Sequence, residues 1–130
     1  DQIPEQVKKH PCFYIINNRP STHPGEHWLA CFFPCKFEPA ELFCSFGKSP
    51  EQYGHELKEV LICNGDGSYK YNKVQIQGDL STACAYFALY FCDLRSRGLS
   101  YEHIMNNFSQ TDLESNEKLV TTYVKLHMTK

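Results

Sequence analysis

Residues 77–94 read QGDLSTACAYFALYFCDL and join a short polar turn to an apolar segment rich in aromatic residues. The apolar side chains recur at helical spacing, and basic residues followed by a glycine, the usual signals of a helix end, come next. We therefore predict a helix that begins near Ser81. Cys84 would lie in its first turn, where N–H groups and the helix dipole lower the pKa of a thiol and can bind an oxyanion.

Three side chains together predict the chemistry of a cysteine peptidase. Cys84 is the candidate nucleophile, His27 at the start of an apolar run is the candidate base, and Gln77 could donate to an oxyanion. Taken singly, each has an ordinary explanation, because cysteine is often buried and a lone histidine or glutamine is more often structural or exposed. The combination makes thiol chemistry the favoured interpretation.

The composition describes a folded chain of 130 residues, of which 42% are hydrophobic and 14% aromatic. We expect a single domain spanning 1–130. A formal net charge of -2 gives no electrostatic reason to expect nucleic acid as a partner, and no apolar run reaches the roughly 18 residues that span a bilayer. The 7 cysteines, most of them in apolar stretches, favour reduced thiols and an intracellular location in the cytoplasm or nucleus.

The order of predicted elements indicates an α+β fold. Runs of β-branched and aromatic residues predict strands, and capping residues before periodic apolar runs predict helices. The expected strands are 12–17, 27–33, 41–46 and, loosely, 69–77; the expected helices run from Ser49 to about Leu61, from Ser81 to Leu94, from Ser100 to Phe108 and from about Ser115 onward. The expected core residues are Cys12, Ile15, Leu29, Phe32, Leu42, Phe87, Leu89, Tyr90, Phe91 and Leu94, with Leu119, Val120, Tyr123 and Val124 docking the last helix.

Three motifs, in this chain order, resemble those of the adenovirus protease (adenain) family and, more distantly, of the proteases that act on ubiquitin-like proteins. They are Pro24-Gly25-Glu26-His27-Trp28-Leu29-Ala30, residues 41–50 (ELFCSFGKSP) and residues 77–86 (QGDLSTACAY). The resemblance covers residues 12 to about 108. It implies a mixed β-sheet flanked by helices, with the nucleophile at a helix N-terminus. It also implies Cys84 as nucleophile, His27 as base, Gln77 in the oxyanion hole, and Trp28 and Ala85 along the substrate groove.

This chain departs from the family pattern at the acid that orients the histidine, because Cys44 stands where the family has a carboxylate. Glu41 has the opposite strand parity from Cys44, and Pro39 separates Glu38 from the strand, so neither glutamate is expected to replace the acid. Ala85 stands where the family has glycine. The family's N-terminal helical portion is also missing before residue 12.

The resemblance implies an endopeptidase that cleaves next to small residues such as glycine, in viral or transposon precursor proteins or in ubiquitin-like tails. Adenovirus relatives are linked to DNA as a cofactor, but the net negative charge of this chain gives no support for carrying that over, so we expect no cofactor. The resemblance leaves open an activating peptide or partner chain and a place in a virus particle. The main alternative is a protease-derived binding protein with weak or no activity, because the acid position holds Cys44.

Two further alternatives concern metal and redox chemistry. A zinc site at His27, Cys31 and Cys35 is disfavoured, because strand residues four apart lie about 13 Å apart whereas zinc ligands lie within about 2.3 Å of the metal. If the predicted fold brings Cys44, His27 and Cys84 together, these residues could instead trap a metal, or the two cysteines could form a disulfide.

Overall fold

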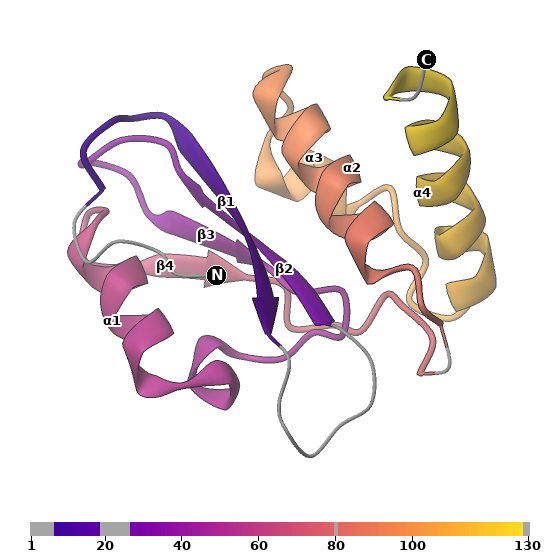
Figure 1. Ribbon diagram of the computed structural model, residues 1–130, viewed down its shortest axis with the longest axis horizontal. Helices are drawn as coiled ribbons and strands as arrows, with labels where there is room; N and C mark the ends of the chain where they lie inside the picture. The colour runs from indigo at the N-terminus through magenta and orange to yellow at the C-terminus, as the bar shows by residue number, and fades with distance from the viewer. Residues whose placement is uncertain (1–6, 19–26, 80, 129–130) are drawn as a thin grey trace.

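The protein folds as an α+β structure with a four-stranded mixed sheet and helices on both of its faces (Figure 1). The structure is a computed structural model that describes residues 7–18, 27–79 and 81–128. The elements in chain order are β1 (Cys12–Asn18), β2 (His27–Phe33), β3 (Ala40–Phe43), the 3₁₀ helix η1 (Pro50–Tyr53), α1 (His55–Cys63), β4 (Tyr69–Tyr71), α2 (Cys84–Ser96), α3 (Tyr101–Met105) and α4 (Leu113–His127).

The sheet has the strand order β1-β2-β3-β4. β1 and β2 pair antiparallel along their whole length, β2 and β3 pair antiparallel with Ala30 opposite Phe43, and β3 and β4 pair in parallel. The predicted strand over 69–77 is wrong beyond Tyr71. Asn72 leaves the ladder because its side chain accepts the main-chain N–H of Cys44 at 2.9 Å.

Side-chain alternation in β2 gives the sheet two apolar faces. Ala30 and Phe32 belong to a cluster with the buried residues of α2, α3 and α4, in which Phe43 stacks on Phe91 with ring centroids 4.9 Å apart. On the opposite face, Leu29 packs in a second cluster with the buried Leu61 of α1. Figure 1 shows α2, α3 and α4 on one side of the sheet and α1 on the other.

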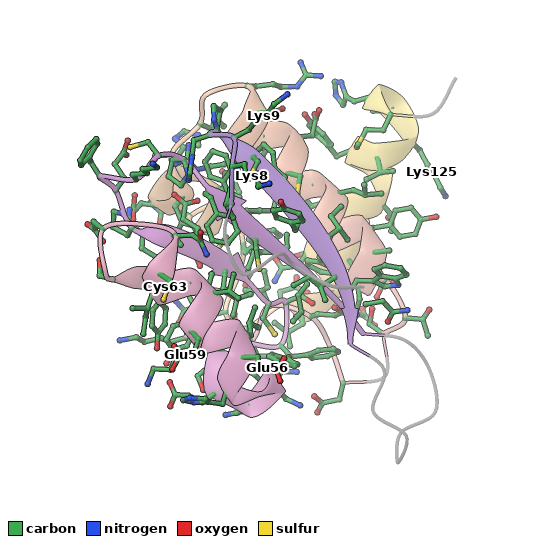
Figure 2. All side chains as sticks on the ribbon, turned by 60° about the vertical axis from the view of Figure 1, so that its left-hand side comes forward. Lys8, Lys9, Glu56, Glu59, Cys63 and Lys125 are labelled. Carbon is green, nitrogen blue, oxygen red and sulfur yellow. The ribbon has the colours of Figure 1, made fainter. Side chains whose placement is uncertain are left out.

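The helix α1 presents charged residues and a thiol to solvent. Glu56, Glu59 and Cys63 are exposed on its outer side, as Figure 2 shows. The helix predicted from Ser49 to Leu61 is interrupted, because the backbone at Gly54 has φ 122° and separates η1 from α1. Ser49 makes no side-chain cap, contrary to the prediction, whereas Ser100 caps α3 as predicted by accepting the N–H of His103 at 3.1 Å.

Three of the expected core residues are less buried than predicted. Ile15 is 37% exposed, and Cys12 and Leu89 are half-buried. β1 is an edge strand, whereas α2 packs over β2, so the helical layer leaves Ile15 partly uncovered. The docking of α4 is confirmed, because Val120 and Val124 are buried and Leu119 and Tyr123 pack against the cluster beside α2.

Candidate active site

Cys84 lies in the first turn of α2, as predicted, although the helix begins at Cys84 itself rather than near Ser81; the residue is 4% exposed. Ala83 precedes it and provides no side-chain cap; its carbonyl accepts the N–H groups of Tyr86 and Phe87 at 2.9 and 3.2 Å. The partial positive charge of the helix N-terminus therefore lies at the residue that carries the thiol. Such an environment favours an anion.

Gln77 is fully buried and links two segments that meet beside Cys84. Ser45 Oγ donates to Gln77 Oε1, and Gln77 Nε2 donates to the carbonyl and the hydroxyl oxygen of Ser81 at 3.1 and 3.2 Å. The Ser81 hydroxyl also accepts the N–H of Ala83 at 3.2 Å. In this arrangement the Gln77 amide forms a bridge from Ser45, the residue after Cys44, to Ser81, three residues before Cys84.

The residues around Cys44 form a tight turn rather than the end of a strand, so the predicted strand over 41–46 is wrong beyond Phe43. The Gly47 N–H donates to the Cys44 carbonyl at 2.9 Å, with Gly47 at φ 71°. The Ser45 carbonyl accepts the main-chain N–H of Gln77 at 3.0 Å. These bonds hold the turn against the segment that leads to Gln77.

Cys44, the residue in the acid position, contacts a phenol. Its Sγ lies 2.9 Å from the hydroxyl oxygen of Tyr53, the last residue of η1. Asn72 fixes the Cys44 main chain from both sides, because Asn72 Oδ1 accepts its N–H at 2.9 Å and Asn72 Nδ2 donates to its carbonyl. The Asn72 amide therefore fixes the main chain of the buried Cys44, and the thiol lies next to the Tyr53 hydroxyl.

Tyr53 is neutral at physiological pH. Burial raises its pKa, and the neighbouring thiols of Cys44 and Cys84 raise it further, since a phenolate would be repelled by a thiolate. Because a charge on Cys84 would also raise the pKa of Tyr53, both thiols lie near this phenol. Sequence analysis missed Tyr53, because nothing in its local pattern distinguishes it from an ordinary helix residue.

His27 opens β2, where its backbone pairs with that of Asn18. The structure describes the backbone of His27 but not its side chain, and Pro24-Gly25-Glu26 of the same motif lie outside the described residues. α2 packs on β2, and Figure 1 shows both elements beginning at the same end of the sheet.

The two predicted groove positions, Trp28 and Ala85, are both half-buried. Trp28 pairs in the β1–β2 ladder with Asn17. The Asn17 Oδ1 atom is buried and has no hydrogen-bond partner within the described part of the chain. It is a polar position at this end of the sheet that sequence analysis did not identify.

The two glutamates considered for the acid position are engaged elsewhere. Glu41 faces α2, where its two carboxylate oxygens accept from Arg95 Nε and a terminal guanidinium nitrogen at 2.9 and 2.8 Å. This orientation confirms the opposite strand parities of Glu41 and Cys44. Glu38 lies in the turn after β2 and accepts from the Cys35 thiol at 3.3 Å.

The described segments, which leave out the His27 side chain, bear on the metal and disulfide alternatives. They contain no group of three or more His, Cys, Asp and Glu residues arranged to hold a metal ion. Cys31 is fully buried, and this burial raises the pKa of its thiol. All seven cysteines lie in described segments, and none of them forms a disulfide there.

Comparison with protein families, with curated proteins and with solved structures finds no match for this chain. Among the helices that the structure describes, none has the length and apolar character needed to cross a membrane.

Proposed function

We propose that this chain is a cysteine peptidase in which Cys84 is the nucleophile and His27 the general base. The observation that carries the proposal is the hydrogen-bonded bridge from Ser45 through Gln77 to Ser81. It ties the turn that bears Cys44 to the segment that leads into the helix bearing Cys84. A buried bridge between these two motifs is the support that a preorganised thiol site requires.

In the proposed reaction, His27 takes the proton from the Cys84 thiol and the thiolate attacks the substrate carbonyl carbon. The new C–S bond leaves an oxyanion, which the Cys84 main-chain N–H stabilises. Collapse of this intermediate breaks the C–N bond, and His27 returns its proton to the leaving amine. Water then attacks the thioester, which releases the carboxylic acid and restores the thiol.

Gln77 is proposed as the second donor to the oxyanion. Its Nε2 atom carries two protons, and both of its acceptors belong to Ser81. Rotation of the Ser81 side chain about its Cα–Cβ bond would move the hydroxyl oxygen away and release one of these protons for the oxyanion, while the bond to the Ser81 carbonyl keeps the bridge intact.

The proposed substrates are proteins or peptides with small residues, glycine above all, at the cleavage site. This specificity follows from the adenain-like motifs, with Trp28 and Ala85 along the groove. Viral or transposon precursor proteins and ubiquitin-like tails are the substrate classes of that family, and an activating peptide or partner chain belongs to the same proposal.

A protease-derived binding protein is the second candidate. The thiol of Cys44 occupies the acid position, and the nearby Glu41 is paired with Arg95 on the other face of the sheet. Without a carboxylate acceptor the imidazole loses the group that fixes its tautomer, which costs about 10⁴ in rate in a serine triad. A Cys–His pair loses less, because the thiolate itself stabilises the imidazolium.

The test compares four proteins on a peptide library with Gly-Gly cleavage sites and with a thiol-reactive probe. Wild type should cleave and be labelled at Cys84, Cys84→Ala should do neither, and Cys44→Asp should raise kcat/KM by about tenfold or more. Cys63→Ala, which removes an exposed thiol on α1, should behave as wild type. If wild type and Cys44→Asp are both folded and inert, the peptidase is rejected in favour of the binding protein.

A further inference from the structure

A buried asparagine on α4 reaches the segment that carries Gln77. Asn116 lies on the same buried stripe of α4 as Val120 and Val124, and it is 2% exposed. Its Nδ2 atom donates to the Ile76 carbonyl at 2.9 Å. An amide among apolar side chains destabilises a fold unless its hydrogen bonds are made. The role of Asn116 therefore lies in the bonds that it makes.

The partners of Asn116 fix the orientation of its amide. Nδ2 has two protons, which go to the carbonyl oxygens of Ile76 at 2.9 Å and Ser109 at 2.7 Å. Oδ1 accepts the Ser109 main-chain N–H at 2.8 Å. A carbonyl can only accept and a main-chain N–H can only donate, so each bond has one possible direction. Through these bonds Asn116 joins α4 and the loop after α3 to Ile76.

The peptide groups on both sides of Gln77 are held by hydrogen bonds. In the group before it, the Ile76 carbonyl accepts from Asn116. The N–H of the same group donates to the Ser45 carbonyl at 3.0 Å. In the group after it, the Gln77 carbonyl accepts from Gln75 Nε2 at 2.7 Å. Because each peptide group is planar, two fixed groups set the direction in which the Gln77 side chain leaves the main chain.

We propose that Asn116 and Gln75 are positioning residues for the oxyanion hole, which hold the main chain before and after Gln77 and so place its amide. This inference rests on the proposed function, because it assigns Gln77 Nε2 to the oxyanion. Neither residue touches a reacting atom. Oxyanion donors act through preorganised placement, and a displacement of about 1 Å can cost about 10²-fold in rate. The last helix then belongs to the framework of the site.

The main test is Asn116→Leu, which keeps the branched shape of the side chain and removes its donors and its acceptor. Two reactions of Cys84 differ in the oxyanion. Peptide cleavage passes through one, whereas iodoacetamide alkylates the thiolate by forming an S–C bond as iodide leaves, with no oxyanion. Asn116→Leu should lower kcat on Gly-Gly peptides by about tenfold or more, and KM and the alkylation rate of Cys84 should stay within about twofold of wild type.

The matched control on α4 is Val120→Ala. Val120 is fully buried on the same stripe and packs in the apolar cluster beneath the helix. Its truncation should lower the urea midpoint through lost packing and leave kcat within about twofold of wild type. This control separates a loss of stability from a displaced oxyanion donor. Urea midpoints of all variants establish that each one is folded.

Gln75→Glu tests the peptide group after Gln77 without changing a core position, since Gln75 is half-buried. An ionised carboxylate has no proton for the Gln77 carbonyl, so kcat should fall while alkylation of Cys84 continues. Asp79→Asn is the control for this variant. The second Gln75 Nε2 proton goes to Asp79 Oδ1 at 2.7 Å, and an asparagine oxygen can still accept it, so kcat should be unchanged.

Each outcome decides for or against positioning. A wild-type kcat in either folded variant, Asn116→Leu or Gln75→Glu, overturns the inference, and Gln75→Glu alone decides should Asn116→Leu not fold. Equal losses of cleavage and of alkylation also overturn it, and so does a loss of kcat in Val120→Ala as large as that in Asn116→Leu, because both mark a purely structural role. Failure of the proposed function gives a different result: Cys84→Ala then leaves the cleavage of every peptide as in wild type, and the inference falls with it.

Discussion

Gly47 allows the turn at the acid position to approach the segment that leads to Gln77. A Cβ at this glycine would lie 2.7 Å from the carbonyl carbon of Val74 and 2.8 Å from the main-chain nitrogen of Gln75. Backbone atoms cannot move aside as the end of a flexible side chain can. The left-handed φ of 71° adds a conformational cost for any other residue.

Gly47→Ala should therefore lower the free energy of unfolding by about 2 kcal/mol or more, the sum of backbone strain and the clash with Val74. The matched control is Gly67→Ala, because Gly67 also has a positive φ, of 98°, but open space where the Cβ would lie. It should cost about 1 kcal/mol from strain alone. Urea denaturation measures both, and equal losses would show that the close approach at Gly47 carries no energetic weight.

Local sequence predicts some site residues and not others. Cys84 could be placed in the first turn of α2 because the polar turn and the apolar run around it are contiguous. Tyr53 could not be identified, because its importance comes from a contact with Cys44 that only tertiary packing creates. Ser45 lies inside a recognised motif, yet its hydroxyl bond to Gln77 depends on a loop approach with no local signature.

At the level of secondary structure, β3 and α2 are joined by a buried ion pair. The side chain of Glu41 is 2% exposed and that of Arg95 17% exposed, and they make two charge-assisted hydrogen bonds. The guanidinium also lies over the Phe32 ring, 4.7 Å from its centroid. Because both charges are largely removed from water, loss of either partner leaves the other unpaired in an apolar setting.

Glu41→Ala should lower the free energy of unfolding by about 3 kcal/mol, because it strands the Arg95 charge against the sheet. Glu102→Ala is the control, because it breaks an ion pair with Lys70 at 3.0 Å. The Glu102 side chain is 65% exposed and the Lys70 side chain 39% exposed. That exposed pair should contribute less than about 1 kcal/mol. Chemical denaturation of both variants tests the difference, and similar losses would contradict the importance assigned to burial.

The elements that local patterns predict well are those whose boundaries are also local. The β1 and β2 strands and the helix α2 match their predicted ranges closely, because turn residues and the arginine-glycine signal end them. β3 and β4 are shorter than predicted. After β3, the main-chain N–H of Cys44 bonds the Asn72 side chain and its carbonyl accepts the N–H of Gly47. After β4, Asn72 therefore uses its side chain, rather than a regular strand ladder, to bond the Cys44 main chain.

Considered as a whole, the molecule brings its candidate site together around one end of the sheet. Cys44 belongs to the apolar cluster on the α1 face, whereas Cys84 begins the helix that covers the other face. The turn after β3 and the segment before α2 leave the sheet at this end and bridge the two faces through Gln77. The position of α2 on the sheet therefore affects the geometry of the site.

Asp93 helps to fix that position because it connects α2 to α4. Its carboxylate accepts from the Tyr123 hydroxyl at 2.5 Å and from Arg97 Nε at 2.9 Å. Burial acts to raise the pKa of Asp93, but these hydrogen bonds and the charge of Arg97 outweigh it and hold the pKa below its ordinary value. The stabilisation is thus present above the unfolded-state pKa of about 4 and is lost as the pH falls through the folded-state value.

Asp93→Asn should therefore lower the free energy of unfolding by about 1 kcal/mol at neutral pH, and the difference from wild type should shrink as the pH falls below about 4. Urea titrations at a series of pH values measure this difference directly. Glu56→Gln, which neutralises an exposed carboxylate on α1 (Figure 2), is the control and should stay within about 0.5 kcal/mol of wild type at neutral pH. A deficit of Asp93→Asn that persisted unchanged in acid would mean that packing, rather than the ionised carboxylate, links α2 to α4.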